Sequence, residues 1–172
     1  GATIRLVSKV EGDFTGSITL ADQMGETECA FLPHQFSNPE NYAAHYATTG
    51  KEILAQLAAF GKRPQGFVAE LVPALVKLDQ LDNILLIDDC DAINMSRKLA
   101  RVLGLGVGIS SGANFLGVLK VQDLLGNKDA VVATVFADDN KKYLSTDLMY
   151  EQTVSADHLA CDVELLGMRA IH

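Results

Sequence analysis

Residues 104–114 read Gly-Leu-Gly-Val-Gly-Ile-Ser-Ser-Gly-Ala-Asn, and this stretch decides the fold class of the chain. A short apolar segment at 105–107 leads through the glycines and serines into a segment where Phe115 and Leu119 recur at helical spacing. A strand, a tight turn and a helix are therefore predicted in succession. The first turn of such a helix presents free backbone N–H groups and the positive end of the helix dipole. This arrangement is typical of a site for an anion or a polar ligand atom.

Strands and helices alternate on both sides of this turn. Short apolar runs predict strands at 3–7, 66–69, 84–87, 105–107 and 131–136. Helices are predicted after Asp13 or Thr15, after the Thr49-x-x-Glu52 capping box, after the acidic residues 88–91 and after the glycine turn. Strands that alternate with helices form parallel βαβ units. We therefore predict an α/β fold, a three-layer sandwich in which helices cover a mostly parallel sheet.

The segment between Ala69 and Leu78 departs from this pattern. It passes from the start of a strand directly into another apolar run, with no turn residues between them. Pro73 lies inside that run, and a proline does not fit a central strand. We expect a join or an unusual bend at this place.

The composition favours small-molecule chemistry over binding to nucleic acids or membranes. The 172 residues carry 14 Lys+Arg and 22 Asp+Glu, a formal net charge of −8, whereas phosphate backbones attract clustered basic residues. No apolar run approaches the roughly 20 residues of a membrane-spanning helix, and no secretory signal is visible at the N-terminus. The 3 cysteines are odd in number and far apart, which is typical of reduced thiols. We expect a soluble, cytoplasmic protein.

The acidic residues and histidines do not predict a metal site. Asp88, Asp89 and Asp91 follow an expected strand, and N-capping of the next helix explains them. His34 and His45 flank a polar loop that offers no third ligand at a suitable spacing.

The glycine turn fits several ligand-binding patterns unequally. It lacks the Gly-x-Gly-x-x-Gly and Gly-Lys-Ser/Thr sequences, which argues against binding of dinucleotides and nucleoside triphosphates. A plain tight turn with a serine cap fits it at least as well as a binding site does. It also matches Gly-x-Ser-x-Gly, the nucleophile elbow of α/β-hydrolases, with Ser110 between Gly108 and Gly112. Asp138 and His158 follow in the order of a hydrolase triad, although His158 is expected at the surface.

Four stretches carry the most specific signal in the sequence. They are Gln-Phe-Ser-Asn-Pro-Glu-Asn at 35–41, Thr-Thr-Gly-Lys-Glu-Ile at 48–53, Gly-Ile-Ser-Ser-Gly-Ala-Asn at 108–114 and Lys-Tyr-Leu-Ser-Thr at 142–146. In this order they resemble the motifs of cysteine synthase (O-acetylserine sulfhydrylase) and its cystathionine β-synthase relatives. The resemblance implies a fold-type II enzyme that depends on pyridoxal 5'-phosphate, with a fold like that of the tryptophan synthase β-subunit.

The resemblance also implies roles for particular residues. Ser110, with Gly108 beside it, would bind the ring nitrogen of the cofactor, and Gln35 and Phe36 would bind and enclose the substrate. A neutral hydroxyl does not hold the ring nitrogen protonated, so the ring is a moderate electron sink that suits β-replacement. The implied reaction replaces the acetoxy group of O-acetyl-L-serine by sulfide and gives L-cysteine. The family further implies a homodimer and association with serine acetyltransferase.

The chain lacks other parts that the family needs. The Schiff-base lysine and the loop that grips the substrate carboxylate belong to a region that would precede Gly1, and no lysine of the chain matches the catalytic one. The phosphate-binding loop should follow the strand at 66–69, where the chain instead continues into the irregular segment. We therefore expect residues 1–172 to form a partial fold, mainly the C-terminal large domain, with a segment missing near 69–71 and an N-terminal region missing.

Three functions stay open at this point. The first is pyridoxal phosphate-dependent β-replacement by a cysteine synthase. The second is a serine hydrolase with Ser110 as nucleophile, and the third is a non-catalytic fragment that only binds a partner. The choice between O-acetylserine, O-phosphoserine and serine with homocysteine also stays open, because the loops that discriminate between them are largely absent from the sequence.

Overall fold

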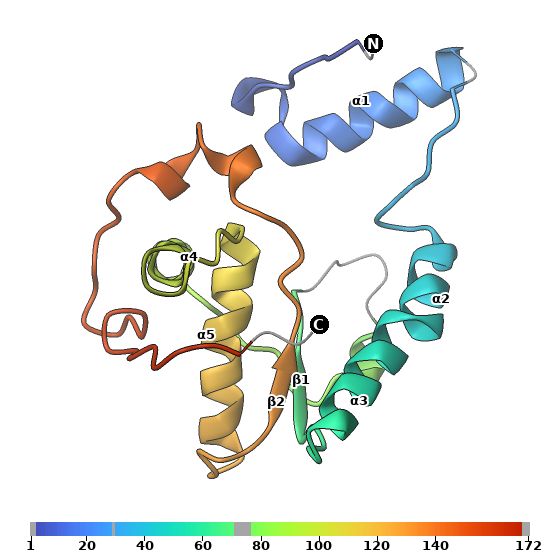
Figure 1. Cartoon of the computed structure of the whole chain (residues 1–172). Helices are drawn as coiled ribbons and strands as arrows, with labels where there is room; N and C mark the ends of the chain where they lie inside the picture. Colours follow the sequence, from blue (N-terminus) through green and yellow to red (C-terminus); the bar gives the residue numbers. More distant parts are fainter. Residues whose placement is uncertain (1–2, 29, 71–76, 170–172) are drawn as a thin grey trace.

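The computed structural model describes residues 3–28, 30–70 and 77–169 (Figure 1). Its helices are α1 (Asp13–Glu28), α2 (Pro39–Ala47), α3 (Thr49–Ala59), α4 (Asp89–Leu103) and α5 (Ile109–Leu124). Its strands are β1 (Gly66–Val68) and β2 (Val132–Thr134). Short 3-10 turns are η1 (Lys9–Glu11), η2 (Leu78–Gln80), η3 (Lys141–Tyr143) and η4 (Asp147–Met149).

The two strands form a parallel pair. Gly66 lies opposite Val132 and Val68 lies opposite Thr134. Thr134 Oγ1 also donates a hydrogen bond of 2.8 Å to the Val68 carbonyl. α5 packs against both strands (Figure 1), and it lies close because a Cβ on Gly117 would stand only 2.8 Å from Val68 Cγ1. The predicted α/β class with a parallel sheet is confirmed, in the form of a partial fold.

The hydrophobic core lies between α4 and α5. Met95, Leu99 and Leu116 are 0% exposed, and Val107 and Ala160 complete the buried cluster. Burial of one large apolar side chain stabilises a fold by about 1.5–3 kcal/mol. The contact between these two helices is therefore the main source of stability around the glycine turn.

α4 has the boundaries that its end residues predict. Asp88 Oδ1 accepts hydrogen bonds from the N–H groups of Cys90 at 2.8 Å and Asp91 at 3.2 Å, which is N-capping. Gly104 ends the helix with a φ of 70°, in the left-handed region that glycine adopts without strain.

The predicted capping box at the start of α3 is not formed. Thr48 has a helical conformation, and its carbonyl accepts from the Glu52 N–H at 3.0 Å. Thr49 Oγ1 contacts His45 Nδ1 of α2 at 3.0 Å. Because α2 runs almost directly into α3, no extended cap residue separates them.

Three of the predicted strands are wrong, because these segments form no strand in the structure. Segments 3–7 and 84–87 are irregular, and Ile4, Leu6 and Leu86 are 81%, 86% and 84% exposed. A strand needs the hydrogen-bond ladder of a neighbour, and the described part of the chain provides none for these segments. Segment 105–107 contributes only one isolated antiparallel bridge, between Val107 and Asp139.

The expected join cannot be compared with the structure. Ala69 and Glu70 are exposed, whereas residues 71–76, with Pro73, lie outside the described residues. The segment proposed to be missing near 69–71 therefore stays a prediction.

Candidate functional site

The glycine turn places two serines in the first turn of α5. Gly108 is the extended N-cap residue, and its carbonyl accepts from the Ser111 N–H at 3.2 Å and the Gly112 N–H at 3.4 Å. Ser110 is half-buried, and Ser111 is 0% exposed with no partner for its Oγ among the described residues. The turn thus offers hydroxyl groups together with the positive end of a helix dipole.

Close packing against α4, and not an unusual backbone angle, requires glycine at position 112. A Cβ on Gly112 would lie 2.9 Å from Ser96 N and would overlap the Ala92 carbonyl oxygen. Ser96 Oγ donates to the Ala92 carbonyl at 3.1 Å and to the Gly108 carbonyl at 2.9 Å. α4 therefore fixes the position of the turn through one buried hydroxyl.

The turn also contacts the segment that follows β2. The Gly108 N–H donates to the Asp138 carbonyl at 3.1 Å, and a Cβ on Gly108 would overlap Asp138 Oδ1. Neither glycine of this contact has a positive φ: Gly108 has a φ of −73°, and Gly106 also lies outside the left-handed region. Both glycines instead allow a close approach, Gly106 to Asn140 and Gly108 to Asp138.

The Lys-Tyr-Leu-Ser-Thr stretch holds the Asp138 carboxylate. The Tyr143 hydroxyl donates to Asp138 Oδ2 at 2.8 Å, and Lys142 Nζ lies 2.6 Å from the same oxygen. Burial and the hydrogen bond to Asp138 raise the pKa of Tyr143, and the contact with Asp138 raises the pKa of Lys142. Asp138 Oδ1 is buried and has no partner in the described part of the chain. This motif therefore fixes a carboxylate beside the glycine turn.

The structure does not join the predicted substrate residues to Ser110. Gln35 is exposed and Phe36 is half-buried, in a turn that precedes α2. The Gln35 carbonyl accepts a hydrogen bond from Asn41 Nδ2 at 2.9 Å. Asn38 caps α2, because its Oδ1 accepts from the Glu40 N–H at 3.0 Å. The polar residues Asn38 and Asn41 thus shape the loop itself.

The residues of a hydrolase triad are not assembled. His158 is 8% exposed, so the surface position expected from the sequence is wrong. Its Nε2 lies 3.2 Å from Asp88 Oδ1, and its Nδ1 has no partner among the described residues. Asp138 pairs with Tyr143 and Lys142 instead. A triad needs the histidine bonded to both serine and acid, and within the described residues His158 bonds neither Ser110 nor Asp138.

Sequence reasoning missed the attachment of the C-terminal segment to α4. The Asp91 carboxylate accepts from the Leu159 N–H at 2.9 Å and the Ala160 N–H at 2.8 Å. Lys98 Nζ donates to the Ala160 carbonyl at 2.7 Å and to the Cys161 carbonyl at 3.1 Å. No local pattern signals these bonds, because the partners are backbone atoms more than 60 residues away.

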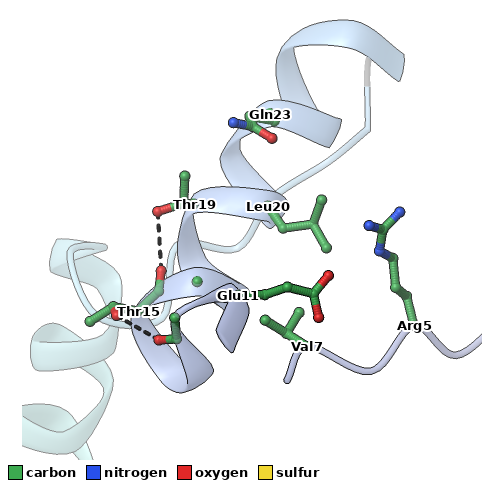
Figure 2. Close-up of a pocket in the computed structure, with 9 residues that line it drawn as sticks. Arg5, Val7, Glu11, Thr15, Thr19, Leu20 and Gln23 are labelled. Atoms are coloured by element: carbon green, nitrogen blue, oxygen red, sulfur yellow. Dashed lines mark hydrogen bonds between the residues drawn. The ribbon is translucent and has the colours of Figure 1, made fainter. Parts of the chain in front are cut away.

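Neither of the two cavities described here is lined by the predicted site residues. One, of about 410 Å³, lies between the N-terminal segment and α1, where Arg5 and Thr15 face it (Figure 2). The other, of about 830 Å³, lies between α4 and the C-terminal segment. Within the described ranges, no group of histidine, cysteine, aspartate and glutamate side chains could hold a metal ion. None of the helices described is both long enough and apolar enough to cross a bilayer.

Comparison with known proteins finds cysteine synthases among the relatives of the chain, although no protein-family model matches it. Cysteine synthase B of Escherichia coli strain K12 is 30% identical over 195 aligned positions, which cover 90% of this chain and 63% of that enzyme. A cysteine synthase of Staphylococcus aureus strain Mu50 is 28% identical, over 77% of this chain and 58% of that one. A solved hydrogen sulfide-producing enzyme from Fusobacterium nucleatum is 41% identical with a TM-score of 0.81, over 94% of this chain and 64% of that one.

The chain therefore spans less than two thirds of the length of these relatives. The similarity nevertheless extends over nearly all of this chain in sequence and in fold. It agrees with the four motifs and with the partial α/β fold. In sequence and in fold the chain resembles the cysteine synthase and cystathionine β-synthase family of fold-type II enzymes, which depend on pyridoxal phosphate.

Proposed function

We propose that this chain is part of a cysteine synthase, which forms L-cysteine from O-acetyl-L-serine and sulfide. The observation that carries the proposal is the half-buried Ser110 at the N-terminus of α5. Ser96 and Asp138 hold its turn from two sides through the Gly108 backbone. A hydroxyl held this firmly can bind one polar atom of a ligand in a fixed place.

The described residues fit one end of the cofactor. Ser110 would bind the ring nitrogen, and Gly108, whose missing side chain lets Asp138 approach closely, would help to fix its position. When bound, pyridoxal phosphate supplies an electron sink for bond changes at the carbons of an amino acid. Because a serine hydroxyl carries no charge, it does not hold the ring nitrogen protonated. The cofactor ring bound by Ser110 would therefore be a moderate electron sink and not a strong one.

The other end of the cofactor has no matching residues in the described part of the chain. Lys98 and Lys120 donate to backbone carbonyls, and Lys142 is paired with Asp138. The alignment to the E. coli enzyme runs over 195 positions but uses only 90% of a 172-residue chain. The relative thus has residues inside the aligned span that this chain lacks, which supports a missing internal segment. We propose from the sequence pattern that this segment lies near 69–71.

The loop before α2 is proposed to enclose the substrate. Gln35 is exposed and its side chain is available to a small polar molecule, while Phe36 is half-buried beside it. Closing such a loop excludes water from the reacting carbons. We also propose a homodimer, association with serine acetyltransferase and a cytoplasmic location, as the family resemblance implies.

A second candidate is the release of sulfide from L-cysteine. The identity to the hydrogen sulfide-producing enzyme is 41%, against 30% to the E. coli cysteine synthase. Both reactions exchange the group on the β-carbon of an amino acid, so the same residues would serve either one. The first replaces acetoxy by sulfide, and the second replaces the sulfur of cysteine by the oxygen of water, which gives serine and hydrogen sulfide. They differ in whether sulfide enters or leaves.

The two directions can be measured on the purified full-length protein supplied with pyridoxal phosphate. An intact mass first shows whether the polypeptide is the 18.5 kDa of this sequence. Cysteine formed from O-acetylserine and sulfide supports the first candidate, and sulfide released from cysteine supports the second. Ser110→Ala should lower either rate and weaken cofactor binding, whereas Thr27→Ala, an exposed hydroxyl on α1, should change neither.

The alternatives predict other results. Cofactor absorbance that never appears, together with no product in either direction, contradicts the proposal and favours a fragment that only binds a partner. Labelling of Ser110 by a fluorophosphonate would instead support the hydrolase.

A further inference from the structure

One face of α4 carries polar and basic side chains along its length. Asn94, Arg97, Lys98 and Arg101 recur at intervals of three or four residues, which places them on the same side of a helix. Leu99, on the other side, is 0% exposed in the core. α4 therefore has an apolar face toward α5 and a basic face away from it.

The C-terminal segment passes over this basic face. Figure 1 shows the chain after η4 running around α4, in orange to red. Arg97 Nη1 donates to the Tyr150 carbonyl at 2.6 Å, and Lys98 Nζ donates to the carbonyls of Ala160 and Cys161. These bonds hold the segment at two places, and the cavity of about 830 Å³ lies between it and the helix.

The cavity has an excess of positive charge. Arg97, Lys98 and Arg101 line it, against a single carboxylate, Glu151. None of the three cations forms an ion pair in the described part of the chain. Arg97 and Lys98 donate to carbonyl oxygens, which carry no charge. The positive charge of the cavity thus contrasts with the formal net charge of −8 of the whole sequence.

The helix dipole does not account for all of this charge. It favours cations within the last turn of a helix, which explains Arg101. Arg97 and Lys98 lie further back, and Arg97 stands one turn before Arg101, where like charges repel each other. An anion bound between the two guanidinium groups would remove that repulsion.

Asn94 also lines the cavity. Its Nδ2 is inaccessible to solvent and makes no hydrogen bond with the described residues. An unsatisfied buried N–H group costs free energy, which an acceptor on a ligand would recover once the amide rotates toward the cavity. Asn94 lies one turn before Arg97, so its donor and the guanidinium groups lie along one line.

The rest of the lining is mostly apolar, and its polar members are Ser96, Asn140 and Gln152. Val107, Leu148 and Val154 contribute to the wall, together with Ala100 of α4. The volume falls within the range of about 300–1,000 Å³ that is typical of small-molecule sites, and it exceeds what a single inorganic ion needs.

We propose that this cavity binds a small organic anion whose carboxylate or phosphate group contacts Asn94, Arg97 and Arg101 and whose apolar body packs against Val107, Leu148 and Val154. The proposed site does not use Ser110, although Val107 of the glycine stretch lines it. It therefore does not depend on the function proposed above.

The test is a titration of the purified chain by calorimetry with three probes. These are phenyl phosphate, 3-phenylpropionate and inorganic phosphate. The proposal predicts that at least one of the two phenyl compounds binds at one site, at least tenfold more tightly than inorganic phosphate. A preference between the phenyl compounds identifies the anionic group, and raised salt should weaken binding.

Variants locate the site. Arg101→Gln should weaken binding at least tenfold, because Arg101 is exposed and holds no other part of the chain. Lys128→Gln removes an exposed cation beyond the end of α5 and should leave the affinity unchanged. Asn94→Leu keeps the branched shape of the side chain without the donor and should weaken binding while leaving the folded protein at least as stable. The proposal is overturned if neither phenyl compound shows saturable binding, or if wild type and Arg101→Gln bind with equal affinity.

Discussion

Gly108 and Asp138 lie so close together that no side chain fits between them. A Cβ on Gly108 would overlap Asp138 Oδ1 and would stand 2.8 Å from Tyr143 Cε2. The φ of Gly108 is −73°, an angle that any residue adopts. Space, and not backbone conformation, therefore selects glycine here, and it does so because the Asp138 carboxylate is held by Tyr143 and Lys142.

Gly108→Ala should destabilise the fold by about 1–3 kcal/mol, the usual cost of overpacking a filled site. The methyl group would force Asp138 away from Tyr143. The measurement is urea unfolding at neutral pH. Gly50→Ala is the matched control, because its Cβ would meet nothing nearer than the His45 carbonyl at 3.6 Å. Equal midpoints for Gly108→Ala and wild type would contradict this account.

Gly112→Ala should cost more than Gly108→Ala, at least about 3 kcal/mol. Its methyl group would meet backbone atoms of α4 at Ala92 and Ser96, which cannot rotate away as a side chain can. The two variants are compared in the same urea titration. If Gly112→Ala proves the milder change, then α4 does not lie against the turn as described.

Alkaline pH should weaken the fold through the Asp138 cluster. The pKa of Tyr143 is raised by burial and by Asp138, and contact with Asp138 raises the pKa of Lys142. Groups whose folded pKa exceeds the unfolded value stabilise the fold fully below the unfolded pKa, about 10 for both, and lose that effect as the pH rises through the folded pKa. Tyr143 should dominate, because the Lys142 side chain is 63% exposed and solvent screens its ion pair.

Urea unfolding from about pH 9 to 11.5 measures this effect. Wild type should lose stability more steeply over this range than Tyr143→Phe, which has no titrating group at that position. Lys141→Gln is the control, because it removes a neighbouring charge whose ion pair with Asp139 is exposed. Parallel curves for wild type and Tyr143→Phe would refute the role of this tyrosine.

Asp91→Ala should destabilise the fold by at least about 2 kcal/mol, because a hydrogen bond to a charged group contributes about 1.5–3 kcal/mol. The change leaves the N–H groups of Leu159 and Ala160 without acceptors. Hydrogen exchange at these two amides should become faster. Asp89→Ala removes an exposed carboxylate from the same helix turn and should cost no more than about 1 kcal/mol. Unchanged exchange in Asp91→Ala would show that other contacts hold the segment.

The features that the sequence predicts correctly depend on neighbouring residues. Asp88 and Gly104 set the limits of α4 because an N-cap and a left-handed glycine act within one turn of the helix. Val132 and its neighbours form a strand that pairs with β1 as expected. The runs near Ile4 and Leu86 are also short and largely apolar, yet they form no strands, because an apolar sequence does not by itself supply a neighbouring strand.

The candidate site was predictable only in part. The serines of the turn follow from the glycine spacing and from the family resemblance. The roles of Asp138 and Ser96 do not, because each acts on Gly108 from a separate part of the chain. His158 was misplaced for the same reason: its burial depends on contact with α4, which no local pattern reveals.

The attachment of the C-terminal segment to α4 has an evolutionary consequence. Asp91 and Lys98 bind main-chain atoms of Leu159, Ala160 and Cys161, which every amino acid provides. The side chains at these positions can therefore change over generations without loss of the hydrogen bonds. Only size restricts Ala160, which is 2% exposed, and only proline at 159 or 160 would remove a donor. Selection should act here on two residues of a helix and leave the segment that they hold free to diverge.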